Sequence, residues 1–80
     1  MRARLLLLGR PDCGLCEDFE AELRTHCGPG RVQLVHEDVD SRPDWQRRYG
    51  LKIPVLLTEE GELICSVQFD PEAFEAFFKG

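Results

Sequence analysis

The chain has 80 residues, of which 42% are hydrophobic and 31% charged, and it carries a net charge of -5 with a pI near 4.9. This balance is that of an ordinary folded globular protein and excludes a disordered or fibrous chain, and the length fits a single domain, residues 1–80, with one modest core. The acidic charge opposes nucleic acid or an anionic membrane as a partner, because phosphate groups bind basic surfaces.

The first third of the chain predicts a strand followed by a helix. Leu5–Leu8 is a continuous apolar run, typical of a central strand covered on both faces. From Gly14 to His26 the spacing predicts a helix that ends at Gly28. Apolar side chains recur at every fourth position of this helix, at Leu15, Phe19 and Leu23.

The middle of the chain predicts a second strand and a short helix. Hydrophobic and polar residues alternate from Arg31 to Asp38, which predicts a strand with Val32, Leu34 and His36 on one face. Ser41-Arg42-Pro43-Asp44 then matches a capping pattern that opens a short helix, with Trp45 and Tyr49 one turn apart and Gly50 at its end.

The last third predicts a hairpin and a final helix. Pro54–Thr58 and Glu62–Phe69 read as two strands joined by a turn at Gly61. Asp70 and Pro71 supply an N-cap and a first-turn proline, and an aromatic stripe follows at Phe74, Phe77 and Phe78. The order β-α-β-α-β-β-α predicts an α/β fold with a four-stranded mixed sheet and helices on both faces.

The apolar run near the N-terminus does not have the length of a targeting or membrane segment. Arg2 and Arg4 precede it, but Gly9, Arg10 and Asp12 interrupt it well short of a signal sequence. We therefore expect a cytoplasmic protein without a membrane partner, and we expect it to act as a monomer. In a reducing compartment thiols are more often catalytic or metal-binding than structural.

The motif with chemical meaning is Cys13-Gly14-Leu15-Cys16, which lies between the first predicted strand and the first predicted helix. A C-x-x-C pair at that position is typical of a redox centre. Zinc or iron-sulfur binding by the same pair is an alternative, but it needs further ligands, and the remaining thiols and imidazoles have poor spacing. Cys27 reads as a thiol at a helix end and Cys65 as a small core residue, and whether those two pair stays open.

At this point the chain resembles a known family. The C-x-x-C, the Ile53-Pro54 pair and the order of elements resemble the minimal, glutaredoxin-sized form of the thioredoxin fold. Three segments are similar to the small bacterial proteins of the glutaredoxin-like DUF836 family, namely Asp12-Cys13-x-Leu15-Cys16, Tyr49-Gly50-x-x-Ile53-Pro54-Val55-Leu56 and Phe69-Asp70.

The resemblance implies a thiol–disulfide oxidoreductase that needs no organic cofactor. Cys13 at the helix N-terminus would be the nucleophile, because unpaired N–H groups there stabilise a thiolate, and Cys16 would be the resolving thiol. Arg10 favours the Cys13 thiolate, whereas Asp12 and the acidic residues after Cys16 disfavour it. The alternative of another class is a thioredoxin-fold module that binds a peptide without turnover.

The resemblance also implies a binding site for the substrate or for glutathione. The Ile53-Pro54 bond would be cis, leaving the Ile53 backbone free to pair with a peptide. Arg10 matches a cation that helps hold glutathione, and Asp70 matches an acidic residue of glutaredoxins, although Val67-Gln68-Phe69 replaces their Gly-Gly. The expected partner is a disulfide-containing protein or a glutathione mixed disulfide, with glutathione as a candidate reductant.

Overall fold

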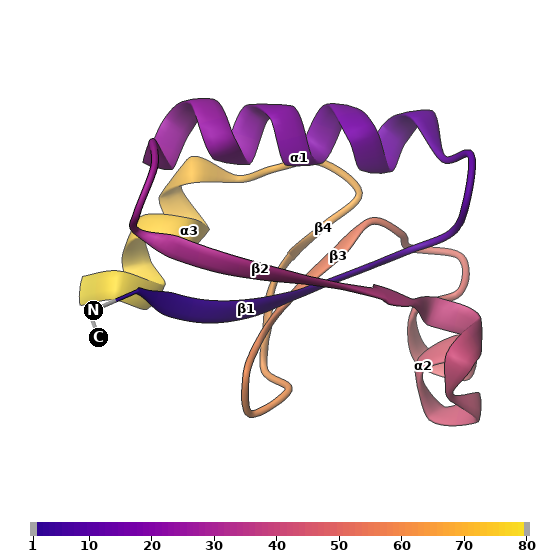
Figure 1. Ribbon diagram of the computed structural model, residues 1–80. Coiled ribbons are helices and arrows are strands. Elements are labelled where there is room, and N and C mark those ends of the chain that lie inside the picture. Colours follow the sequence, from indigo (N-terminus) through magenta and orange to yellow (C-terminus); the bar gives the residue numbers. More distant parts are fainter. Residues whose placement is uncertain (1, 80) are drawn as a thin grey trace.

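The computed structural model describes residues 2–79, in which three α-helices pack on a four-stranded sheet (Figure 1). In chain order the elements are β1 (Ala3–Gly9), α1 (Gly14–Cys27), β2 (Val32–Asp38), the 3-10 helix η1 (Val39–Ser41), α2 (Pro43–Tyr49), β3 (Val55–Thr58), β4 (Leu63–Ser66) and α3 (Pro71–Lys79). This order is the predicted one, with η1 added before α2. No helix within residues 2–79 is both long and apolar enough to cross a membrane.

The sheet is mixed, as the sequence predicts, with strand order β2-β1-β3-β4. β1 runs parallel to β2, because α1 returns the chain to the starting edge, and it runs antiparallel to β3. β3 and β4 form the predicted hairpin, in which the Gly61 N–H donates to the Thr58 carbonyl at 2.9 Å. The register pairs Leu8 with Val55, so the end of β1 lies beside the start of β3.

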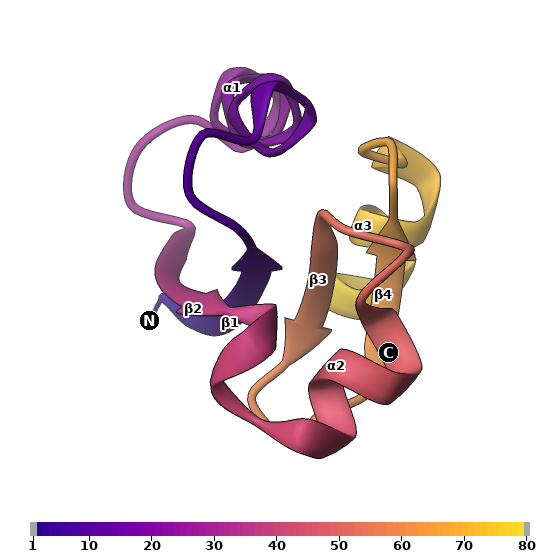
Figure 2. The ribbon, with the colours of Figure 1, turned by 90° about the vertical axis from the view of Figure 1, so that its right-hand side faces the viewer.

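The core occupies both faces of the sheet because successive residues of β1 point to opposite sides. Leu5 and Leu7 contribute to a cluster beneath α1 and α3, whereas Leu6 and Leu8 contact a second cluster beneath α2. Figure 2, which views α1 end on, shows α2 on the other side of the sheet from α1. The prediction that the apolar run is covered on both faces is therefore confirmed.

The apolar stripe predicted for α1 is only partly buried. Phe19 and Leu23 are fully buried against the sheet, but Leu15 is 57% exposed. Leu15 lies in the first turn of α1, which extends past the end of β1 (Figure 1), and it belongs to neither core cluster. The prediction that Leu15 belongs to the core stripe is wrong.

The start of α2 also differs from its prediction. Ser41 does not cap α2; it belongs to η1, where its hydroxyl donates to the Asp38 carbonyl at 2.7 Å. The N-cap of α2 is Arg42, whose side chain binds the Asp44 carboxylate and accepts no capping hydrogen bond from the helix, and none of the helical residues is fully buried. Asp38 caps η1 instead, because its carboxylate accepts the Asp40 N–H at 2.8 Å.

The second hairpin strand is shorter than predicted. β4 ends at Ser66, because Val67 has a φ of 70°, which lies outside the extended region. A register shift opposite Leu56 and Leu57 further twists this edge strand. The segment from Val67 to Phe69 is therefore a loop that leads into α3.

Candidate functional site

Cys13 and Cys16 lie at the start of α1 and form a disulfide, with their Cα atoms 5.2 Å apart. Cys13 is the N-cap residue of α1, and its sulfur accepts a hydrogen bond of 3.2 Å from the Cys16 N–H. Both cysteines are partly exposed. The arrangement puts the Cys13 sulfur against unpaired N–H groups of the first helical turn, where a negative charge on sulfur is stabilised.

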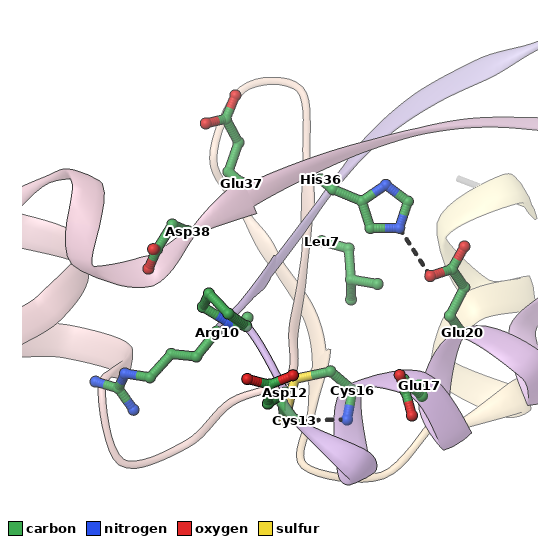
Figure 3. A pocket seen from close by; sticks show the side chains of 12 residues that line it. Leu7, Arg10, Asp12, Cys13, Cys16, Glu17, Glu20, His36, Glu37 and Asp38 are labelled. Atoms are coloured by element: carbon green, nitrogen blue, oxygen red, sulfur yellow. Dashed lines mark hydrogen bonds and ion pairs between the residues drawn. A yellow bond between two sulfur atoms is a disulfide. The ribbon is translucent and has the colours of Figure 1, made fainter.

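A groove of about 330 Å³ opens beside the disulfide, between the start of α1 and the end of β2 (Figure 3). Its lining is rich in carboxylates and comprises Leu7, Gly9, Arg10, Pro11, Asp12, Cys13, Cys16, Glu17, Glu20, His36, Glu37 and Asp38. The end of β1 contributes Leu7 to the groove, because alternate residues of that strand face α1.

The side chain of Arg10 points away from the disulfide (Figure 3). Its guanidinium donates two hydrogen bonds to Asp40, of 2.8 and 3.1 Å, and a third of 2.7 Å to the Gly50 carbonyl. The hydrogen bond with Asp40 raises the pKa of Arg10, and the same bond lowers the pKa of Asp40. Arg10 thus joins the loop before Cys13 to η1 and to the end of α2.

Glu20 and His36 form a pair on the other side of the groove. A Glu20 carboxylate oxygen lies 2.8 Å from His36 Nε2, and the second oxygen accepts from Arg24 at 2.8 Å. Burial acts to raise the pKa of Glu20, but the hydrogen bonds from His36 and Arg24 outweigh it, and the pKa is lowered. Glu20 is therefore an ionised carboxylate at the groove.

The Ile53–Pro54 peptide bond is cis, as the resemblance implies. The register that pairs Leu8 with Val55 places Pro54 level with Gly9, one residue beyond the last pair. A Cβ on Gly9 would lie 2.9 Å from the Cys16 sulfur, so the end of β1 touches the disulfide. The structure therefore brings the cis-proline and the cysteine pair to the same end of the sheet, although Ile53 and Pro54 do not line the groove.

Asp70 lies apart from the groove and caps α3, as predicted from the sequence. Its carboxylate accepts the N–H groups of Glu72 and Ala73 at 3.0 and 3.2 Å. The role in binding expected for Asp70 stays a prediction.

The two remaining cysteines are free thiols. Cys27 is the last residue of α1, and its thiol donates to the Gly28 carbonyl at 3.3 Å. Cys65 in β4 packs against the cluster beneath α1 and α3, and burial raises its pKa. Among residues 2–79 no group of three or more His, Cys, Asp or Glu side chains is placed to hold a metal ion.

Several residues of the site were not predicted from the sequence. Asp40 and Gly50, the partners of Arg10, lie 30 and 40 residues after it, and no local pattern links them. His36 pairs with Glu20, which lies 16 residues before it in a different element, and no local pattern links the two. Gly9 carried a signal, since a glycine between a buried strand and a C-x-x-C indicates a close approach of two backbones or side chains.

Together these features define the class of fold. A thioredoxin-like fold has the strand order β2-β1-β3-β4, a cysteine pair at the start of α1 and a cis-proline before β3, as this chain does. Thioredoxin 1 from Thermosipho africanus has this fold at a TM-score of 0.58, with 11% identity over 95% of this chain and 94% of its own.

Within this fold the chain can be assigned to one family. It belongs to the family of the glutaredoxin-like domain DUF836, whose model matches residues 4–79. Two solved structures of similar proteins cover nearly all of it. Ne2328 from Nitrosomonas europaea has 27% identity and a TM-score of 0.84 over 96% of this chain and 92% of its own. XcR50 from X. campestris has 28% identity and a TM-score of 0.65 over 94% of this chain and 95% of its own. No curated protein matches the chain.

Proposed function

We propose that the protein is a thiol–disulfide oxidoreductase in which Cys13 is the nucleophile and Cys16 the resolving thiol. The observation that supports this most directly is the disulfide between the N-cap of α1 and its first turn, at the mouth of a groove. Cys13 and Cys16 are partly exposed and line this groove, which leaves room for a second sulfur to approach. The position of Cys13 at the helix N-terminus favours its thiolate once the pair is reduced.

The reaction takes place in two exchanges and starts from the dithiol. The Cys13 thiolate attacks a sulfur of the substrate disulfide, the substrate S–S bond breaks, and one substrate thiolate leaves and takes up a proton. The Cys16 thiolate then attacks the Cys13 sulfur and releases the second substrate thiol. The substrate has gained two electrons and Cys13–Cys16 is a disulfide. Two thiol equivalents from glutathione or a protein dithiol reset it.

The test is to equilibrate the protein in a series of reduced and oxidised glutathione buffers, alkylate the free thiols and measure the masses. We expect a reversible Cys13–Cys16 disulfide with a potential between about -270 and -120 mV, the range of working oxidoreductases. A background in which Cys27→Ser and Cys65→Ala remove the free thiols restricts the readout to the pair.

Single substitutions separate the two roles. Cys13→Ser should abolish disulfide reduction, whereas Cys16→Ser should accumulate a mixed disulfide on Cys13. Equal residual turnover in both variants would overturn this assignment. A pair that stays reduced in every buffer would instead favour a binding module without turnover.

A further inference from the structure

The charges around the groove are not balanced. Arg10 is held by Asp40 and by the Gly50 carbonyl, so its charge is largely neutralised and is directed away from the disulfide (Figure 3). The imidazole of His36 is paired with Glu20. Arg10 and His36, the basic residues of the lining, are therefore already engaged by partners within the protein.

Two carboxylates beside the disulfide are left without such partners. Asp12 precedes Cys13 and Glu17 follows Cys16, and both side chains are exposed on the lining of the groove. Neither forms an ion pair within the described residues 2–79. A substrate that brings its sulfur to Cys13 must therefore pass two negative charges that no ion pair within residues 2–79 neutralises.

The same end of the molecule exposes apolar side chains. Leu15 lies between the two cysteines and is 57% exposed, and Leu51, between α2 and β3, is fully exposed. Leu51 follows Gly50, whose carbonyl is bound by Arg10 from the loop before Cys13, so Leu51 lies next to the residue that anchors this loop. Apolar side chains exposed at the same end as the disulfide offer contact area that a protein partner can cover and a small anion cannot.

We propose that the reduced protein acts preferentially on protein disulfides whose cysteine is flanked by lysine or arginine, and discriminates against glutathione disulfide. The inference rests on the proposed function and names the substrate class of the same site. Asp12 and Glu17 select cationic residues on either side of the substrate sulfur, while Leu15 and Leu51 contact apolar residues of the partner. Glutathione disulfide carries a net negative charge, so the same carboxylates repel it.

The exchange is the one described above, with the basic protein disulfide as oxidant and the Cys13–Cys16 dithiol as reductant. It can be followed in a single turnover by the pre-reduced protein, so no further electron donor is needed. The probes are two peptides with an intramolecular disulfide that differ only in carrying lysine or glutamate next to each cysteine, together with glutathione disulfide and the uncharged bis(2-hydroxyethyl) disulfide. Each rate is divided by the rate of the same probe with dithiothreitol, which removes its intrinsic reactivity.

We expect the lysine peptide to react about fivefold faster than the glutamate peptide, since exposed charge pairs each contribute a small factor. The preference should vanish when salt rises from about 0.01 M to about 1 M, because the screening length falls from roughly 30 Å to roughly 3 Å. The double variant Asp12→Asn with Glu17→Gln should lower the ratio below about twofold. Glu22→Gln with Glu62→Gln, which changes the net charge equally away from the groove, should leave the ratio unchanged.

The ratio of the reaction rates of the two peptides is the decisive readout. Neutralising residues next to Cys13 also changes the reactivity of Cys13 toward every disulfide, and the ratio removes this common effect. Equal rates for the two peptides, with bis(2-hydroxyethyl) disulfide still reduced, would overturn the substrate preference and leave the oxidoreductase function intact. The same holds if the control variant changes the ratio as much as the groove variant. Failure to reduce even the uncharged probe would overturn the proposed function, and this inference with it.

Discussion

The N–H of Val67 donates a hydrogen bond of 2.8 Å to the carbonyl of Pro54 and so joins the end of β4 to the start of β3. Val67 reaches this carbonyl in a left-handed conformation, with a φ of 70°. The Gln68 N–H donates to the Ser66 carbonyl at 2.8 Å, so Val67 is the central residue of a γ-turn with positive φ, which is strained for a β-branched residue and open to glycine. The contact lies at the end of the sheet that carries the disulfide.

Val67→Gly should therefore stabilise the protein by about 1 kcal/mol, because glycine adopts the same backbone without strain and this gain exceeds its entropy cost. Little packing is lost, since the Val67 side chain is 43% exposed. The free energy of unfolding in urea, measured on the disulfide form, gives the value. Val67→Thr is the matched control, because it keeps the β-branch and should bring no gain. An equal gain from both variants would show that loss of the valine side chain, and not backbone conformation, is responsible.

Gly9→Ala should destabilise the disulfide form by roughly 1–3 kcal/mol, as overpacking does in a filled core. The added methyl group would lie 2.9 Å from the Cys16 sulfur, which the disulfide prevents from rotating away. In the dithiol form that sulfur is free to rotate, so the loss should be smaller. Urea unfolding of both redox forms measures the difference.

Gly14→Ala is the control for the previous variant. A Cβ on Gly14 has no neighbour within 4 Å, and alanine is the better helix former at the first position of α1. We expect it to leave the stability unchanged or to raise it slightly in both redox forms. A loss equal to that of Gly9→Ala would contradict the close contact between Gly9 and Cys16.

The free energy of unfolding should fall in acid partly because Glu75 becomes protonated. The Glu75 carboxylate joins α3 to Arg31 and to His26 in α1. Hydrogen bonds from Arg31 and then His26 lower the pKa of Glu75 from its ordinary value of 4.5. The contribution of this carboxylate is therefore fully present above pH 4.5 and is lost as the pH falls through its folded value. The difference in unfolding free energy between the natural protein and Glu75→Gln should shrink below that pH.

The pH series needs a neighbouring carboxylate as its control. Glu72→Gln changes an exposed residue of α3. The unfolding free energy of this variant should differ from that of the natural protein by a constant amount throughout the acid range. If it converged with the natural protein as Glu75→Gln does, the acid sensitivity would come from net charge rather than from the contacts of Glu75.

Leu15→Gln should leave stability within about 0.5 kcal/mol, as exposed substitutions do, yet slow the reduction of a peptide disulfide relative to a small one. The leucine has no core contact to lose, and it lies between the two cysteines. Leu63→Gln removes a leucine of similar exposure, 55%, from β4 and should leave both rates unchanged. Equal slowing by the two variants would show that Leu15 has no special place beside the site.

Most of the fold was predictable because its signals are local. The run Leu5–Leu8, the repeat through Phe19 and Leu23, and the Asp70 cap each involve residues within a few positions of one another. The errors came where tertiary context decides. Leu15 fits the helical repeat, but its turn lies beyond the end of the sheet. The Ser41 pattern resembles a cap, but Asp38 starts a 3-10 turn first and uses that serine.

The candidate site was predicted less completely than the fold. The sequence places the cysteine pair and the proline, because each belongs to a short motif at a known position of the fold. It could not show that Arg10 is bound by Asp40, since that contact spans 30 residues and depends on how η1 leaves β2. Because Asp40 binds the Arg10 guanidinium, the positive charge that the sequence places next to the C-x-x-C motif does not face a substrate. An arginine beside a motif therefore does not by itself show where its charge is directed.

The α2 helix has seven residues, no side-chain cap and no fully buried side chain. Its amide protons should therefore exchange with solvent through local opening well before those of β1 and β3, which pair with strands and lie in the core. Arg10 binds the carbonyl of Gly50 at the end of α2, so opening this helix removes one of the three hydrogen bonds that hold the Arg10 side chain and leaves the two to Asp40. A weakly protected helix is thus connected, through one arginine, to the loop that carries the disulfide.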